Sequence, residues 1–147
     1  SRLFVSSGYG KGGSLFKLEE GKAPEEIWKS KVLRTQLNAA VFYDGHLYGV
    51  DGDTTQKATL KCVNFDTGEE KWAEPGFGAG GVLVAGDHLI ALSGIGELMI
   101  APASPSGFKT TARMQVFGPN GWTAPILANG FLYCRNGRGE LVALNLQ

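Results

Sequence analysis

A unit of two apolar strands joined by a tight turn recurs along the chain, and this repeat constrains the fold more than any other feature. Residues 40–48 align without gaps on residues 82–90 and 125–133, and Leu3-Phe4 matches the end of the unit. The marker leucines of the four copies lie 44, 42 and 43 residues apart: Leu3, Leu47, Leu89 and Leu132. A period of about 20 to 50 residues is typical of proteins built from stacked modules.

Each copy predicts a small antiparallel sheet. The two apolar strands are joined by Asp44-Gly45, Gly86-Asp87 or Asn129-Gly130, which supply the positive backbone angles that a two-residue hairpin requires. A third apolar strand follows in every copy, at residues 14–18, 59–63, 97–101 and 140–144. In the second copy Asp66-Thr67-Gly68 turns the chain once more into a strand that ends at Trp72. The unit therefore has four strands.

Four short antiparallel strands at this period fit the blade of a β-propeller. No stretch shows the apolar period of a helix. We therefore predict an all-β fold, a β-propeller of four-stranded antiparallel blades, with about three and a half blades in this chain. Residues 1–147 are expected to form one partial propeller, with blades at about residues 1–36, 37–78, 79–121 and 122–147.

A partial propeller needs something to cover its ends. Closed propellers have about four to eight blades, whereas here the first copy lacks its first strand and the fourth copy lacks its last. Such a molecule exposes edge strands and the apolar faces of its end blades. The chain also starts at Ser1 within a strand-like run and shows no signal peptide. We expect either a fragment whose missing blades belong to a longer parent chain, or an assembly with a second copy.

The charge of the chain argues against two classes of partner. Lys plus Arg and Asp plus Glu each number 14, so the formal net charge is zero. Binding to nucleic acid or to a membrane surface calls for a basic face, and neither is expected here. There is no run of about eighteen apolar residues, so the sequence predicts no transmembrane segment.

Residues 62–72 carry a family resemblance. They resemble the signature of the PQQ-like (pyrroloquinoline-quinone-like) repeat, Ala-x-Asp-x-x-Thr-Gly-x-x-x-Trp, with Cys62 and Asn64 at its Ala and Asp positions. Trp28 precedes Trp72 by one repeat period. The third copy departs from the signature at residues 101–109, which contain no Thr-Gly-x-x-x-Trp. WD40 blades have a similar period, but no tryptophan of this chain is followed by Asp.

The resemblance implies an extracytoplasmic protein, periplasmic or secreted, of bacterial type. The chain resembles the outer-membrane assembly lipoprotein and its relatives. It also resembles propellers that are named alcohol or polyvinyl alcohol dehydrogenase by analogy. The function that the resemblance implies is a non-catalytic scaffold that uses no cofactor. Its partner would be a protein or peptide, which pairs with an exposed strand edge or lies across the loops at one face.

An alternative function stays open, the C-terminal portion of a PQQ- and calcium-dependent alcohol dehydrogenase. The resemblance would then imply PQQ on the propeller axis, stacked on tryptophan and held with calcium by acidic and amide side chains, and a carboxylate as general base. Enzymes of that kind often carry a disulfide between adjacent cysteines, which Cys62 and Cys134 cannot supply. We expect these two cysteines to be buried and unpaired.

The tryptophans and histidines are the first candidate site residues. Trp28 and Trp72 recur at the repeat period, so packing between blades explains them. Trp122 falls outside that register and is a candidate for lining the axial channel or a face. His46 and His88 follow hairpin turns without metal-ligand spacing, and we expect ordinary turn residues.

Two loop features complete the candidates. Gly10-Lys11-Gly12-Gly13 lacks the Ser/Thr and the helix of a phosphate-binding loop, so a hairpin loop is expected. The loop carboxylates Asp51, Asp53 and Asp66 could bind calcium but lack the twelve-residue loop with its closing Glu. We assign no catalytic residue and no metal ligand, and the position of any cofactor site is unknown.

Overall fold

The computed structural model describes residues 1–55 and 57–146, and its regular elements there are all β-strands. They form four antiparallel sheets that follow one another along the chain. Sheet 1 contains β1 (Arg2–Ser7), β2 (Gly12–Lys17) and β3 (Glu25–Ser30). Sheet 2 contains β4 (Val41–Tyr43), β5 (His46–Asp51), β6 (Thr59–Asn64) and β7 (Glu70–Glu74). Sheet 3 contains β8 (Gly81–Ala85), β9 (His88–Leu92), β10 (Glu97–Pro102) and β11 (Ala112–Gln115). Sheet 4 contains β12 (Ile126–Ala128), β13 (Phe131–Arg135) and β14 (Leu141–Asn145).

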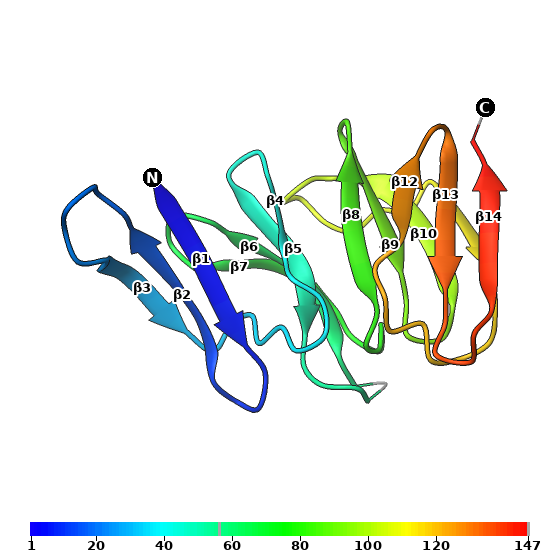
Figure 1. Cartoon of the computed structure of the whole chain (residues 1–147), viewed down its shortest axis with the longest axis horizontal. Coiled ribbons are helices and arrows are strands. Elements are labelled where there is room, and N and C mark those ends of the chain that lie inside the picture. Colours follow the sequence, from blue (N-terminus) through cyan, green and yellow to red (C-terminus); the bar gives the residue numbers. More distant parts are fainter. Residues whose placement is uncertain (56, 147) are drawn as a thin grey trace.

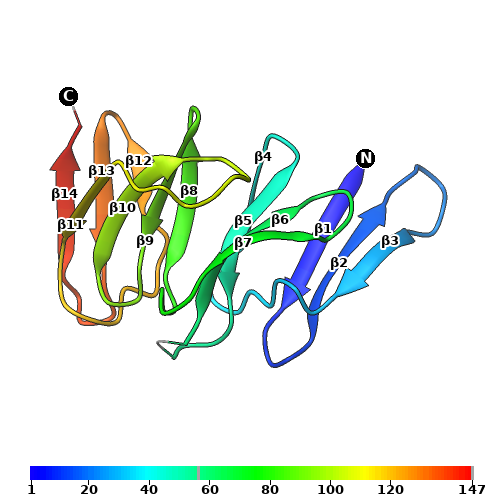
Figure 2. The same ribbon diagram turned by 180° about the vertical axis from the view of Figure 1, so that it is seen from behind.

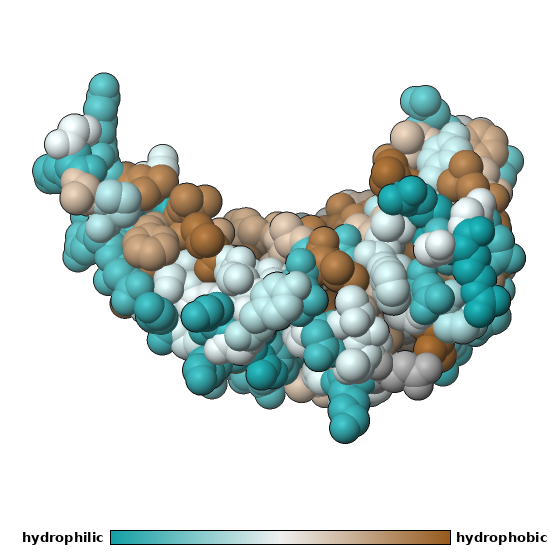
Figure 3. Space-filling model, turned by 60° about the horizontal axis from the view of Figure 1, so that its bottom comes forward, coloured by the Kyte–Doolittle hydropathy of each residue, from teal (hydrophilic) through white to brown (hydrophobic). Residues whose placement is uncertain are grey.

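The predicted fold class is confirmed. Sheets 2 and 3 have four strands, and sheets 1 and 4 have three each in the described part of the chain. The four sheets stand side by side along the molecule (Figure 1), and the space-filling view shows a crescent with a concave upper side (Figure 3). The first strands β4, β8 and β12 lie towards the viewer in Figure 1, whereas the last strands β7 and β11 come forward when the molecule is turned (Figure 2). This is an open segment of a β-propeller, while the residue boundaries of its blades stay a prediction.

The hairpins form where the sequence predicts them. The central residues Asp44 and Gly45 have φ of 43° and 72°, and Asn129 and Gly130 have φ of 51° and 78°. Two successive positive φ values give the hairpin turn whose twist matches that of the flanking strands. The register of the two strands follows directly, with Tyr43 opposite His46.

Among the residues that the structure describes, the hydrophobic core consists of three layers, each between two neighbouring sheets. We call the face of a sheet that is turned towards the preceding sheet its leading face, and the opposite face its trailing face. Leu47 lies on the leading face of sheet 2 against sheet 1, Leu89 does the same in sheet 3, and Leu132 in sheet 4. Each of these three leucines is at most 2% exposed. The repeat is therefore a repeat of inter-sheet contacts.

The third sheet differs from the second at its outer side. Its last strand, β11, pairs with β10 although the sequence there has no repeat signature. β11 carries no tryptophan, and the loop before it provides Phe108, whose ring stacks on Trp72 of the preceding sheet with the centroids 5.6 Å apart. Within the described residues, no helix is long and apolar enough to cross a membrane.

Candidate functional site

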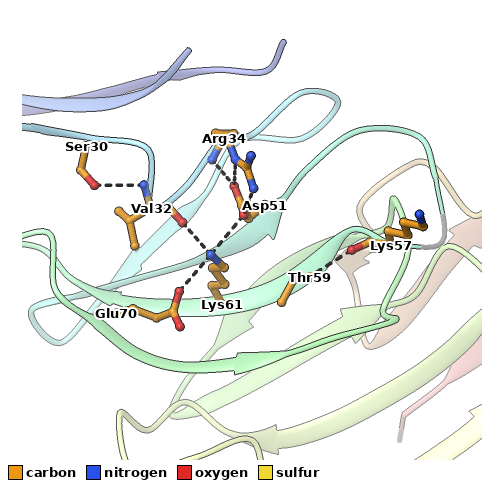
Figure 4. A network of polar contacts seen from close by, with 8 residues as sticks. All are labelled: Ser30, Val32, Arg34, Asp51, Lys57, Thr59, Lys61 and Glu70. Carbon is orange, nitrogen blue, oxygen red and sulfur yellow. Dashed lines mark hydrogen bonds and ion pairs between the residues drawn. The ribbon is translucent and has the colours of Figure 1, made fainter. Parts of the chain in front are cut away.

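A cluster of charged side chains lies at the junction of sheets 1 and 2 (Figure 4). Asp51, at the end of β5, is 3% exposed. Arg34 donates three hydrogen bonds to its carboxylate, from the backbone N at 2.7 Å, from Nε at 2.8 Å and from Nη2 at 2.7 Å. The Nζ of Lys61 lies 3.1 Å from Asp51 Oδ2 and 2.9 Å from Glu70 Oε2, and it donates to the Val32 carbonyl at 3.1 Å.

This cluster is electrically balanced, with two cations and two carboxylates. Burial by itself would raise the pKa of Asp51, but the hydrogen bonds from Arg34 and Lys61 outweigh it and hold that pKa below its ordinary value. The carboxylate therefore stays ionised and engaged with protein groups. The cluster fastens the segment after β3 to sheet 2, which is a structural role.

The three loop carboxylates considered for calcium have separate partners. Asp51 belongs to the cluster just described. Asp53 Oδ1 accepts a hydrogen bond from the Thr55 backbone N at 2.9 Å, and Asp66 forms an ion pair with Arg2. Among the described residues, no three side chains of metal-ligating type converge.

The periodic tryptophans join neighbouring sheets. Trp28 Nε1 donates to the Phe65 carbonyl at 2.9 Å, and Trp72 Nε1 donates to the Ser104 carbonyl at 2.8 Å. Each indole thus reaches a loop of the following sheet. The packing predicted from their spacing is present, and the hydrogen bonds to loop carbonyls have no signal in the sequence.

Trp122 lies in the segment that leads into β12. The residue is 41% exposed, and its backbone carbonyl accepts a hydrogen bond from Asn38 Nδ2 at 2.9 Å. The same amide nitrogen donates to the Gly80 carbonyl, and the side-chain oxygen of Asn38 accepts from the Ala124 backbone N at 3.3 Å. Asn38 therefore ties together the segments that lead into β4, β8 and β12, and no pattern in the sequence indicates this role.

The remaining candidates behave as ordinary structural residues. His46 Nδ1 lies 2.8 Å from the Asp44 carbonyl, and His88 Nδ1 lies 2.7 Å from Asp87 Oδ1, both beside their hairpin turns. Residues 8–11 form the turn between β1 and β2, closed by a hydrogen bond from the Lys11 N to the Gly8 carbonyl. The glycine-rich stretch is thus the hairpin that the sequence predicts.

Both cysteines are buried and unpaired in the part of the chain that the structure describes. Cys62 lies in the layer between sheets 2 and 3, and Cys134 in the layer between sheets 3 and 4. Burial raises the pKa of each thiol to about 11. At neutral pH both thiols are protonated, which makes them poor nucleophiles and poor metal ligands.

Two grooves lie where sheets 1 and 4 are one strand narrower than sheets 2 and 3. The first, of about 380 Å³, is bordered by residues 4–6 of β1 and by residues 35–40 of the segment before β4. The second, of about 250 Å³, lies between β14 and sheet 3. Its lining side chains are mainly apolar, and they include Ile100, Met114 and Leu144. Met114 is 47% exposed.

The edge of β14 beside the second groove offers backbone hydrogen-bonding groups. The Leu146 N donates to the Gly130 carbonyl at 2.9 Å, so even-numbered residues of this strand bond to β13. Because an antiparallel ladder alternates, Leu141 and Ala143 direct their backbone groups to the opposite edge. No described strand pairs with that edge. An apolar groove beside such an edge is the geometry used for adding an extended strand.

Comparison with known proteins identifies the fold and no closer relationship. No family model matches the chain, and no curated protein matches it. The solved structures that it resembles include BamB from Moraxella catarrhalis, with 17% identity and a TM-score of 0.67, covering 98% of this chain and 41% of that one. The computationally designed Ika8 protein matches with 13% identity and a TM-score of 0.66, covering 97% of this chain and 42% of that one. Quinohemoprotein alcohol dehydrogenase from Comamonas testosteroni matches with 21% identity and a TM-score of 0.54, covering 75% and 19%.

The chain has the fold of a propeller segment. It spans about two fifths of the length of BamB and of Ika8. At these identities the likeness concerns the fold, so function has to be argued from the surfaces of this chain.

Proposed function

We propose that the chain is a non-catalytic protein-binding scaffold of the PQQ-like repeat family, which binds an extended segment of a partner protein at the free edge of β14. The observation that carries the proposal is the apolar groove of about 250 Å³ beside that edge. The repeat signature at residues 62–72 supports the family, and the family resemblance supports an extracytoplasmic location.

The hydrogen-bonding geometry favours a partner in the extended conformation. In sheet 2 the third strand, β6, pairs on this side with β7, whose sequence is Glu-Lys-Trp-Ala-Glu. β14 is the third strand of sheet 4, so its free edge corresponds to the edge of β6 that β7 occupies. A bound segment would exchange backbone hydrogen bonds with Leu141 and Ala143, as β7 does with β6.

The side chains of the groove set the chemistry of the partner. A strand added beside β14 would direct alternate side chains towards Ile100, Met114 and Leu146. These groups are apolar, and the thioether of Met114 adapts to side chains of different shape. We therefore expect a partner segment whose alternate residues are apolar and which contains no proline among the residues that pair with β14.

The experiment uses the seven-residue peptide Lys-Val-Thr-Val-Thr-Val-Lys, capped at both ends, whose alternate residues are apolar. Isothermal titration measures its dissociation constant, and amide hydrogen exchange identifies the amides that it protects. We expect protection at Leu141 and Ala143. Ala143→Pro removes one donor from the free edge but leaves the β13 ladder intact, and it should weaken binding by about tenfold or more.

Two matched controls accompany this variant. Leu127→Pro places proline on the opposite edge of the same sheet and should leave peptide binding unchanged. Met114→Leu keeps the groove apolar and should bind normally, whereas Met114→Glu should not. If the peptide protects other amides, or binds as well when proline interrupts it, the proposed function is wrong.

A second candidate function rests on the fold similarity to quinohemoprotein alcohol dehydrogenase. Under this alternative the chain is the C-terminal portion of a PQQ- and calcium-dependent alcohol dehydrogenase. Under the proposed function the chain requires neither PQQ nor calcium. Addition of both to the protein, followed by quinone absorbance and by dye reduction with alcohols, separates the two functions. A quinone signal together with alcohol-dependent dye reduction would support the dehydrogenase.

A further inference from the structure

Every junction inside the molecule joins the trailing face of one sheet to the leading face of the next. Between sheets 2 and 3, Tyr48 and Leu60 of the trailing face pack with Leu89 and Ala91 of the leading face. Between sheets 3 and 4, Ile90 and Leu98 pack with Leu132 and Cys134. The same two kinds of surface therefore meet at each junction, so a trailing face is the surface that packs against a leading face.

The leading face of sheet 1 has no sheet against it. Leu3 is 47% exposed, although the equivalent leucines 47, 89 and 132 are at most 2% exposed. Val5, on the same face of β1, is 49% exposed, and the equivalent Ala91 is fully buried. Phe16 lies opposite Leu3 in β2. In β3 the same face carries Glu26 and Lys29, which pair with Phe16 and Ser14. The part of the face formed by β1 and β2 has the apolar character of a junction surface.

The trailing face of sheet 4 is exposed in the same way. Leu141 occupies in sheet 4 the position that Leu60 has in sheet 2 and Leu98 in sheet 3. Each of these leucines pairs with the residue three positions after the marker leucine of its sheet. Leu141 is 67% exposed, whereas Leu60 and Leu98 are at most 4% exposed. Ile126, the equivalent of Val41 and Leu83 in the first strand, is 63% exposed. This face is apolar and is of the kind that packs against a leading face.

We infer that a second copy of this chain covers both surfaces, with the trailing face of sheet 4 in each copy packed against the leading face of sheet 1 in the other. The contact is head-to-tail and reuses the junction already present between sheets. The concave outline of the single chain is that of part of a ring (Figure 3). A head-to-tail contact generates a ring when its rotation closes, and two copies would supply eight sheets, a number found in closed propellers.

On the trailing face of sheet 4, Arg135 replaces an apolar residue of the preceding sheets, and this replacement allows a test of the inference. Arg135 occupies the position that Val50 and Leu92 take in the preceding sheets, where these side chains are at most 8% exposed. An arginine covered by a second copy without a carboxylate partner opposes association. Arg135→Leu should therefore strengthen association, by about tenfold in the dissociation constant.

The main experiment uses two variants with opposite charges on the two faces. Leu3→Lys places a cation on the leading face of sheet 1, and Ile126→Glu places an anion on the trailing face of sheet 4. Sedimentation velocity between about 1 and 500 μM gives the molar mass of the original chain and of each variant. We expect the original chain to form dimers, and each variant by itself to be monomeric or to dissociate at least about tenfold more easily.

Mixing the two variants distinguishes a head-to-tail contact from other modes. The mixed dimer has one original junction and one junction that pairs Lys with Glu, so mixing should restore association. If two copies associated through the same face of each, only the variant with its substitution on that face would lose association. An original chain that stays monomeric over the whole range, or association that neither variant changes, would overturn the inference. Circular dichroism confirms that both variants keep the fold, and the peptide titration at β14 remains a separate measurement.

Discussion

The indole of Trp72 shows how a single residue joins two sheets. It stacks on Phe108, and its N–H reaches a backbone carbonyl of the loop after β10. When a buried indole N–H donates to an acceptor in the protein, its transfer from water costs little free energy. Tyr48 presents the opposite case. Its hydroxyl is fully buried, and among the described residues it is the one buried side-chain N or O atom without a hydrogen-bond partner.

This difference leads to a prediction for Tyr48→Phe. Burial, together with the adjacent Cys62 thiol, raises the pKa of Tyr48 above its usual range. Because the hydroxyl is desolvated and the Cys62 thiol beside it is only a weak hydrogen-bonding group, its removal should increase the free energy of unfolding by about 1 kcal/mol. Urea denaturation of the variant measures this change. Tyr43→Phe, on a half-buried residue of the same sheet, is the control and should change stability by less than about 0.5 kcal/mol. A destabilised Tyr48→Phe variant would show that the hydroxyl has a partner.

At the scale of elements, the segment between β3 and β4 has no regular structure and yet is firmly held. The Asp51 cluster fastens it at Arg34, and Asn38 fastens its other end to the segments before β8 and β12. Sequence patterns identify strands and hairpins because alternation and turn residues are local. The partners of Asp51 come from the segment before β4 and from β6, and only the assembled sheets bring them together. For this reason the sequence presented Asp51 as a loop carboxylate.

Asp51→Asn tests the importance of this cluster. It leaves Arg34 and the largely buried Lys61 without their shared carboxylate, and it should lower the free energy of unfolding by about 3 kcal/mol at neutral pH. Since the pKa of Asp51 is lower in the folded protein than its ordinary 3.8, the stabilisation is present in full above about pH 3.8. It is lost as the pH falls through the folded-state pKa.

The measurement is urea denaturation of both proteins between neutral pH and pH 3. The difference between the original chain and Asp51→Asn should be largest at neutral pH and should shrink at the acid end. Asp44→Asn changes an exposed turn residue and serves as the control, with a difference near zero throughout. A constant difference across the pH range would contradict the role assigned to the carboxylate.

The last strand of sheet 3, β11, could be predicted from the sequence only in part. The repeat period predicted four strands in each unit, and β11 is indeed present. Its position could not be read from residues 101–109 because the signature is absent there. The loop instead supplies Phe108 and the Ser104 carbonyl to Trp72 of sheet 2. The groove beside β14 was equally hidden, since it depends on how Met114 and Leu146 meet across two sheets.

At the scale of the whole molecule, stability is expected to vary along the row of sheets. In a repeat protein it is approximately the sum of the modules and of the interfaces between neighbours. Sheets 2 and 3 each have two interfaces, whereas sheets 1 and 4 each have one within the chain. Local opening should therefore begin at the ends. The two thiols are suited to report it, because each lies in a different layer.

We predict that Cys134 reacts with a thiol reagent faster than Cys62 under native conditions at neutral pH. Both thiols are buried with a pKa of about 11, so reaction requires opening of the surrounding sheets. Opening sheet 4 breaks one interface, whereas exposing Cys62 in sheet 2 disrupts an interior layer. Peptide mass spectrometry of briefly labelled protein measures both rates, with Cys62→Ala and Cys134→Ala as single-thiol controls.

The same experiment at increasing protein concentration connects local opening with assembly. If a second copy covers the trailing face of sheet 4, that sheet gains a second interface and opens less often. The reaction of Cys134 should slow as the concentration rises, while the reaction of Cys62 should change much less. In Ile126→Glu the concentration dependence should disappear. Equal rates for the two thiols would mean that the four sheets open as one cooperative unit, and the difference between end and interior sheets would then be wrong.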